Sequence, residues 1–205
     1  MKFTKILGPV AMAALALMAF ASTASATTLE VKGVTQTSAV TIKSTLKSGT
    51  TALLTDTSGF FANTCTTSTV EGSDSTAKTG TEVEGPISSE VKEGVTVWKL
   101  SWGTLATPCT EGNPTVDAGG SLSIARIGTT TNGTVKSKNA TVTVPSALGK
   151  LTCTTPAEGT DLGTLTGVAS GTATMDISAV LSCGITAKWT GTYVVTSPEG
   201  LGVVS

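Results

Sequence analysis

Apolar and hydroxyl-bearing side chains alternate along several stretches of the chain, the pattern of a β-strand with one buried face. The clearest alternation covers residues 172–183, where only Val180 breaks the pattern. Residues 185–195 repeat it, so the two stretches are expected to pair as antiparallel strands across a turn near Gly184. The side chains predicted to point inward are Met175, Ile177, Ala179, Leu181, Cys183, Ile185, Ala187, Trp189, Tyr193 and Val195.

A third strand is predicted at residues 140–144, with Val142 and Val144 directed inward. Asn132-Gly133 stands between two further apolar stretches, and this dipeptide favours the central positions of a type I′ hairpin turn. The sequence therefore predicts a β-hairpin centred on Asn132 and Gly133.

Composition extends the β prediction to the rest of the chain. Threonine is abundant, there are 23 glycines, and strong helix formers are scarce after residue 26. Threonine and valine favour strands and glycine favours turns, so we expect an all-β fold, a disulfide-stapled β-sandwich of immunoglobulin-like style. A disordered chain would be less hydrophobic than 39% and more highly charged than a net −1.

Similar blocks recur in the same order in the two halves of the chain. Residues 28–31 resemble 121–124, residues 40–46 resemble 142–148, and residues 64–67 resemble 152–155. An internal duplication into repeats 27–120 and 121–205 is one reading. The other is one continuous sandwich over residues 27–205, which we favour because each half has few large apolar residues with which to build a separate core.

All four cysteines follow residue 26. Four cysteines allow three pairings, and the sequence alone does not choose among them. The repeat favours bonds within each half, which joins Cys65 to Cys109 and Cys153 to Cys183. The chain has no Cys-x-x-Cys pair and no histidine, so no metal site is expected at the cysteines.

Residues 1–26 have the features of a secretory signal peptide. Lys2 and Lys5 precede an apolar stretch at residues 6–20, and Ala24-Ser25-Ala26 is a site that signal peptidase recognises. The apolar stretch is shorter than the roughly 20 residues of a bilayer-spanning helix. We therefore expect cleavage after Ala26, a secreted or surface-associated protein, and no membrane insertion of the mature chain.

Charge narrows the range of partners. The chain has 13 basic and 14 acidic side chains, and the basic ones form no cluster. Nucleic acids and anionic membranes bind clustered Lys and Arg, so neither is expected as a partner. The partner expected is therefore a cell-envelope component or an extracellular ligand.

The chain contains no histidine, so it lacks the usual general base near neutral pH and every Ser-His or Cys-His arrangement. A hydrolase would need paired carboxylates, for which Asp161 and Asp176 are the candidates. These two side chains read more simply as a turn residue and an exposed strand residue. No phosphate-binding or dinucleotide motif occurs, so we expect neither an enzyme nor a cofactor.

The most acidic stretch could supply oxygen ligands to calcium, through Glu71, Asp74, Glu82 and Glu84. Their spacing matches no calcium-binding loop. Exposed polar surface is the simpler interpretation, and no metal is expected.

Trp98 and Trp102 fall on one face of a predicted strand, where two aligned rings could stack on a sugar or another flat ligand. A tryptophan near a disulfide is equally typical of a β-sandwich core, and Cys109 follows closely. Phe60-Phe61 is a second aromatic pair in a predicted loop, and we expect one of these two rings to be buried.

Six blocks of the chain resemble a group of short exported bacterial proteins rich in threonine and glycine. The blocks are residues 24–31 (ASATTLEV), 130–135 (TTNGTV), 162–167 (LGTLTG), 173–177 (ATMDI), 189–193 (WTGTY) and 195–203 (VTSPEGLGV). No activity is assigned to that group, so the resemblance implies bacterial export and carries over no site residue.

Together these features predict a secreted, non-catalytic binding or structural module at or near the bacterial surface. The alternative is a soluble extracellular protein that binds carbohydrates or apolar small molecules, with Trp98 and Trp102 as candidate contacts. A carboxylate-dependent hydrolase is the third reading.

Overall fold

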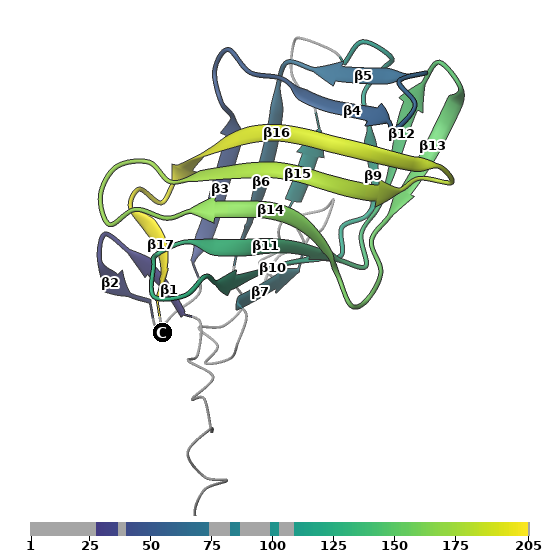
Figure 1. Cartoon of the computed structure of the whole chain (residues 1–205). Helices are drawn as coiled ribbons and strands as arrows, with labels where there is room; N and C mark the ends of the chain where they lie inside the picture. The colour runs from purple at the N-terminus through teal and green to yellow at the C-terminus, as the bar shows by residue number, and fades with distance from the viewer. Residues whose placement is uncertain (1–27, 37–39, 74–82, 87–98, 103–108, 205) are drawn as a thin grey trace, which may run out of the picture.

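The computed structural model describes residues 28–36, 40–73, 83–86, 99–102 and 109–204, with the backbone alone at 71–73, 83–86 and 99–102. The predicted signal peptide lies outside these residues, so its cleavage stays a prediction. Every regular element in the described part of the chain is a strand (Figure 1). The strands are β1 (Thr28–Val31), β2 (Val34–Thr35), β3 (Thr41–Leu46), β4 (Ala52–Asp56), β5 (Ala62–Cys65), β6 (Ser68–Ser73), β7 (Val83–Pro86), β8 (Lys99–Trp102), β9 (Thr115–Ala118), β10 (Ser121–Arg126), β11 (Gly133–Lys138), β12 (Thr141–Ser146), β13 (Gly149–Thr154), β14 (Thr160–Thr166), β15 (Thr174–Ser182), β16 (Thr186–Ser197) and β17 (Leu201–Val204).

Most of these strands belong to one 14-stranded antiparallel sheet that folds back on itself. Its main path runs β7-β10-β11-β14-β15-β16-β3-β6-β8. In Figure 1 the strands β10, β11, β14, β15 and β16 lie side by side across the front, while β3 and β6 run behind them at a steep angle. A separate 3-stranded sheet, β17-β1-β2, lies beside one end of this arrangement. The prediction of an all-β, sandwich-like fold with two disulfides is confirmed.

Two long strands, β15 and β16, allow the large sheet to fold back on itself. β16 pairs along one edge with β15, while its other edge pairs first with β4 and then with β3. β15 likewise pairs with β14 along its first half and meets β13 at its end, through Thr154 and Ser182. β12, β13 and β9 continue from there. Each long strand therefore belongs to two diverging parts of the sheet, which enclose the core between them.

The strand pairs cross the proposed boundary between residues 120 and 121. β7 pairs with β10, β9 pairs with β12, and β16 pairs with β3 and β4. The internal duplication itself stays a prediction.

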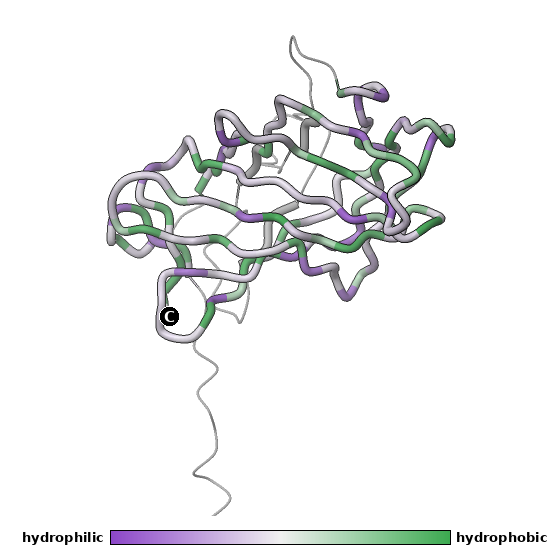
Figure 2. The backbone as a smooth tube through the Cα atoms, turned by 45° about the horizontal axis from the view of Figure 1, so that its top comes forward, coloured by the Kyte–Doolittle hydropathy of each residue, from purple (hydrophilic) through white to green (hydrophobic). Residues whose placement is uncertain are grey.

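The alternation at the C-terminal end of the chain gives the predicted faces, except that Ile185, predicted to point inward, lies in the turn between β15 and β16 and is 38% exposed. In β15 the side chains of Met175 and Ile177 are buried, whereas Val180 is 59% exposed. In β16 the side chains of Trp189 and Tyr193 are buried. The turn between the strands contains Gly184 at positive φ, as predicted. Figure 2 shows hydrophobic, neutral and hydrophilic segments that follow one another along the tube.

The hairpin of β10 and β11 forms, but the prediction that Asn132-Gly133 makes its turn is wrong. Arg126 pairs with Gly133, so the connection is the longer segment 127–132, in which Gly128 takes the positive φ. Gly133 is required by packing instead, because a Cβ there would lie 2.5 Å from Ile124 Cγ2. The Asn132 side chain accepts a hydrogen bond from the Gly167 backbone N–H (3.1 Å).

Candidate functional site

An apolar cavity of about 70 Å³ lies between the layers of the large sheet. Side chains from β4, β5, β6 and every strand from β10 to β16 line it. Leu122, Val135, Leu162 and Met175 represent the aliphatic part of the wall. The alternation along each strand explains the composition, because the side chains of the front strands that line this space lie on the inward face.

The lining contains no Lys, Arg, Asp or Glu side chain among the described residues. Apolar cavities tend to remain free of water, because a water molecule needs two to four polar partners. A charged ligand would lose its hydration there without gaining a counter-ion. The cavity is therefore suited to a small uncharged molecule.

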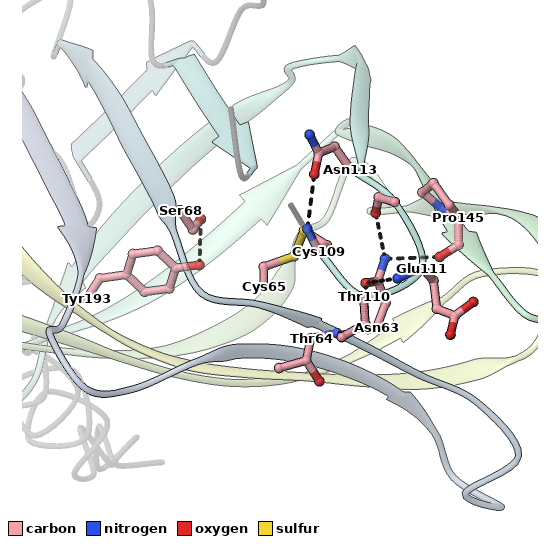
Figure 3. The surroundings of a disulfide bond; sticks show 11 residues. Asn63, Thr64, Cys65, Ser68, Cys109, Thr110, Glu111, Asn113, Pro145 and Tyr193 are labelled. Atoms are coloured by element: carbon pink, nitrogen blue, oxygen red, sulfur yellow. Dashed lines mark hydrogen bonds between the residues drawn. A yellow bond between two sulfur atoms is a disulfide. The ribbon is translucent and has the colours of Figure 1, made fainter. Parts of the chain in front are cut away.

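Tyr193 forms part of the wall and is fully buried. Its ring meets that of Trp189 edge to face, with centroids 6.3 Å apart. Its hydroxyl donates to Ser68 Oγ at 3.0 Å (Figure 3). Burial raises the pKa of Tyr193 above its ordinary value of 10.0, and the hydrogen bonds to Ser68 and Trp189 only partly oppose this shift.

The raised pKa predicts alkaline unfolding. Above pH 10 the tyrosine ionises in the unfolded chain but not in the folded one, so the unfolded state binds fewer protons. The free energy of unfolding should then fall by about 1.4 kcal/mol per pH unit from this residue. Tyr193 is the chain's one tyrosine, so tyrosinate absorbance reports on it alone. We expect this absorbance to rise only together with loss of the circular dichroism of the strands.

The variant Tyr193→Phe serves as the control for that titration. It removes the ionisable group and should move alkaline unfolding to higher pH, although it loses the bond to Ser68. Tyrosinate formation near pH 10 in a protein that keeps its strand signal would contradict the prediction.

Asn63 closes another part of the wall, and its amide group is fully engaged (Figure 3). Its Nδ2 donates to the carbonyl oxygens of Gly112 and Pro145, both at 3.0 Å. Its Oδ1 accepts from the Glu111 backbone N–H at 3.2 Å and from the Thr110 hydroxyl at 3.5 Å. One buried amide thus ties β5 to the segment before β9 and to β12, and it has no hydrogen-bonding capacity left for a ligand.

Both disulfides lie against this wall. Cys65 is bonded to Cys109 and Cys153 to Cys183, the two pairs that the repeat favours. Cys65 and Cys153 line the cavity, and all four sulfur-bearing side chains are buried. Around the first bond, the Cys109 backbone N–H donates to Asn113 Oδ1 at 3.1 Å, as Figure 3 shows. The disulfides therefore fix two walls of the cavity to their neighbouring segments.

The proposed stacking pair falls outside the side chains that the structure describes. Trp98 and the side chain of Trp102 lie outside the described part of the structure, so their role in ligand binding stays a prediction. The calcium hypothesis also stays a prediction. Its candidate ligands lie outside the described part of the structure, namely Asp74, Glu82 and the side chains of Glu71 and Glu84.

The structure does describe the candidate carboxylates, and neither lines the cavity. Asp161 and Asp176 are both exposed. Asp161 Oδ1 accepts from the Gly163 backbone N–H at 3.0 Å, and Asp176 Oδ1 accepts from the Thr192 hydroxyl at 2.8 Å. Each carboxylate thus has a local structural partner on the outer surface.

The loop aromatics behave as predicted, with one ring buried and one exposed. Phe61 is 3% exposed and Phe60 is 81% exposed. The Phe61 backbone N–H donates to Asp56 Oδ1 at 3.0 Å, which fixes the turn and directs the two rings to opposite sides.

Sequence reasoning missed the cavity. The inward positions of β15 and β16 were recognisable from their alternation, but an enclosed space depends on how strands from both halves meet. Asn63 gave no local signal, because its partner Pro145 is 82 residues away along the chain.

Within the described residues, no helix has the length and apolarity of a membrane span. No protein-family model matches the chain, and neither a curated protein nor a solved structure is significantly similar to it. The site therefore has to be interpreted from its own geometry.

Proposed function

We propose that the chain is a secreted, non-catalytic bacterial binding module that holds a small apolar molecule between its sheet layers. The observation that carries this proposal is the cavity, lined by strands of both halves, uncharged among the described residues and bordered by both disulfides. Ligand sites in β proteins are concave, mainly apolar and largely preformed, and this cavity has those features.

Several sequence features support the extracellular part of the proposal. The signal-peptide pattern at residues 1–26 and the resemblance to exported bacterial proteins both favour secretion. Two disulfides favour an oxidising compartment. A non-catalytic role is supported by the absence of histidine from the sequence and by the structural roles of Asp161 and Asp176. The immunoglobulin-like style rests on strand spacing alone and is part of this proposal.

The test is a titration of oxidised residues 27–205 with small uncharged hydrocarbons. Binding is detected through the methyl signals of the protein in nuclear magnetic resonance spectra. Saturable shifts should appear at Val135, Leu162 and Met175, which line the cavity. The exposed methyl groups of Val180 should not shift.

A cavity-filling variant sharpens the experiment. Ala140→Leu places extra side-chain volume at the wall and should abolish the shifts, whereas the matched outward change Val180→Leu should leave them intact. Lining methyl signals that stay unshifted at saturating ligand in the wild-type protein would reject the proposal.

A second candidate is a module that docks on the cell envelope. The observation in its favour is a set of exposed apolar side chains on three turns: Phe60 between β4 and β5, Leu148 between β12 and β13, and Ile185 between β15 and β16. These turns lie at the same end of the molecule, on the right in Figure 1. The Thr57 backbone N–H donates to the Thr186 carbonyl oxygen, which joins two of them.

Co-sedimentation of the mature protein with washed bacterial envelopes tests this second candidate. Saturable sedimentation that the variant Phe60→Ser with Leu148→Ser loses would support it. A wild-type protein that stays in the supernatant would reject docking on the envelope, and the soluble ligand-binding function would be the one that remains.

A further inference from the structure

A pair of neighbouring hydroxyl groups interrupts the apolar wall of the cavity. Ser137 on β11 and Thr155, directly after β13, both line it, and their Oγ atoms are 3.3 Å apart. Ser137 is 5% exposed. This hydroxyl pair, Ser137 with Thr155, joins two parts of the sheet that are separated by the cavity.

A count of protons shows that the hydroxyl pair has one hydrogen-bond donor to spare. The Thr155 Oγ accepts from the Ala140 backbone N–H at 2.9 Å. The bond between the two hydroxyls uses one of their two protons, whichever of them donates. The remaining proton has no acceptor among the described residues.

Other polar groups of the lining are already engaged. The Asn63 amide uses both of its donors on carbonyl oxygens, and the Tyr193 hydroxyl donates to Ser68. Thr154, which also borders the cavity, is an exposed residue of β13. The hydroxyl pair, of which Ser137 is buried and Thr155 half-buried, can thus still donate a hydrogen bond to a ligand.

We propose that the hydroxyl pair of Ser137 and Thr155 anchors the ligand by donating a hydrogen bond to its oxygen atom, so the ligand is an uncharged aliphatic molecule with one acceptor oxygen, such as an alcohol or a ketone. This proposal rests on the proposed function of the cavity. A carboxylate is disfavoured because the described part of the lining contains no cationic side chain to offset its desolvation. A cavity of about 70 Å³ holds about three to five non-hydrogen atoms, because a cavity of roughly 150 Å³ holds benzene and a single water molecule needs roughly 10 to 15 Å³.

Three probes of equal size separate the contributions of shape, hydrogen bonding and charge. Pentane, 1-butanol and butylammonium have the same number of non-hydrogen atoms and differ at one end. Their dissociation constants are measured from the methyl shifts of Leu162 and Met175. We expect pentane and 1-butanol to bind and butylammonium not to bind.

The double variant Ser137→Ala with Thr155→Val removes both hydroxyl protons and keeps the side-chain sizes close to the originals. The double variant should weaken the binding of 1-butanol by about five- to ten-fold, the usual effect of one hydrogen bond, and leave the affinity for pentane unchanged. The matched control is Ser178→Ala with Thr166→Val, two exposed positions on β15 and β14, which should change neither affinity. For each probe, the affinity of the variant is divided by that of the wild-type protein. The ratio for pentane reports any change in the shape or hydrophobicity of the cavity, so the difference between the two ratios reports the hydrogen bond.

The wild-type protein provides a measurement that does not depend on folding of the variant. Nuclear Overhauser effects should place the oxygen-bearing carbon of 1-butanol beside the Thr155 methyl group and its other end among the aliphatic side chains. An oxygen end located beside Leu54, at another part of the wall, would overturn the anchor.

The outcomes distinguish this proposal from the one on which it rests. Wild-type protein that binds none of the three probes would overturn both. Pentane binding with an unchanged affinity of the double variant for 1-butanol, or an equal loss for both probes, would overturn the hydroxyl anchor alone. Butylammonium binding as tightly as 1-butanol would overturn the assignment of an uncharged ligand.

Discussion

Replacing Gly163 with alanine should lower the free energy of unfolding by about 3 to 5 kcal/mol. Gly163 has a φ of 144°, and an added Cβ would lie 2.0 Å from the Asp176 carbonyl oxygen on the neighbouring strand. The residue sits at a bulge, where Val135 of β11 pairs with Gly163 and Lys136 pairs with Asp161. Backbone strain costs about 1 to 3 kcal/mol and forced displacement of packed atoms a similar amount. Urea unfolding followed by circular dichroism measures the loss.

Gly171→Ala is the matched control for this substitution. Gly171 also has a positive φ, of 86°, but no atom of the described residues lies within 4 Å of a Cβ placed there. Only the backbone strain should then appear, about 1 to 2 kcal/mol. Equal losses at the two glycines would show that the close approach of β14 and β15 at Gly163 does not determine the effect.

Removal of the Cys153–Cys183 disulfide by alanine at both positions should cost about 3.6 kcal/mol. The bond closes a segment with a sequence separation of 30 residues, and the chain-entropy treatment assigns about that value to the freedom regained by the unfolded chain. For a protein of ordinary stability, about 5 to 15 kcal/mol, this is a large fraction of the total. Chemical unfolding of the double variant and the oxidised wild type gives the difference.

The other disulfide provides an internal comparison. Cys65 and Cys109 are separated by 44 residues, so their removal should cost about 4 kcal/mol, slightly more than the first pair. Wild-type protein under reducing conditions should be less stable than either double variant. A loss below about 1 kcal/mol for the Cys153–Cys183 pair would mean that loop closure in the unfolded chain is not the main contribution.

Local periodicity was sufficient to predict the faces of the strands. Met175 and Trp189 are buried and Val180 is exposed, because the alternation of side chains along a strand is fixed by the backbone itself. Gly184 forms the predicted turn for a similar reason, since its neighbours pair directly across it. Phe61 is buried and Phe60 exposed, as expected of adjacent residues.

Contacts between distant segments account for what the sequence did not reveal. Asn132 and Gly133 have a strong local turn preference, yet the bond to Gly167 and the close approach to Ile124 override it. The cavity has the same origin, because β16 must pair with both β3 and β4 before its walls meet. The hydroxyl pair of Ser137 and Thr155 also joins two strands that no local pattern relates.

The double pairing of β16 bears on the order in which the chain can fold. Its partners β3 and β4 are made early during synthesis, and β1 pairs with β17, the last strand described. One edge of each of these early strands is therefore unpaired until β16 and β17, more than a hundred residues later in the chain, have been made. Such distant pairing makes folding slow relative to a protein of local contacts. A chain of this topology reaches its native state only after its C-terminal strands are free to join, and until then its early strands are available to any chaperone that binds extended segments.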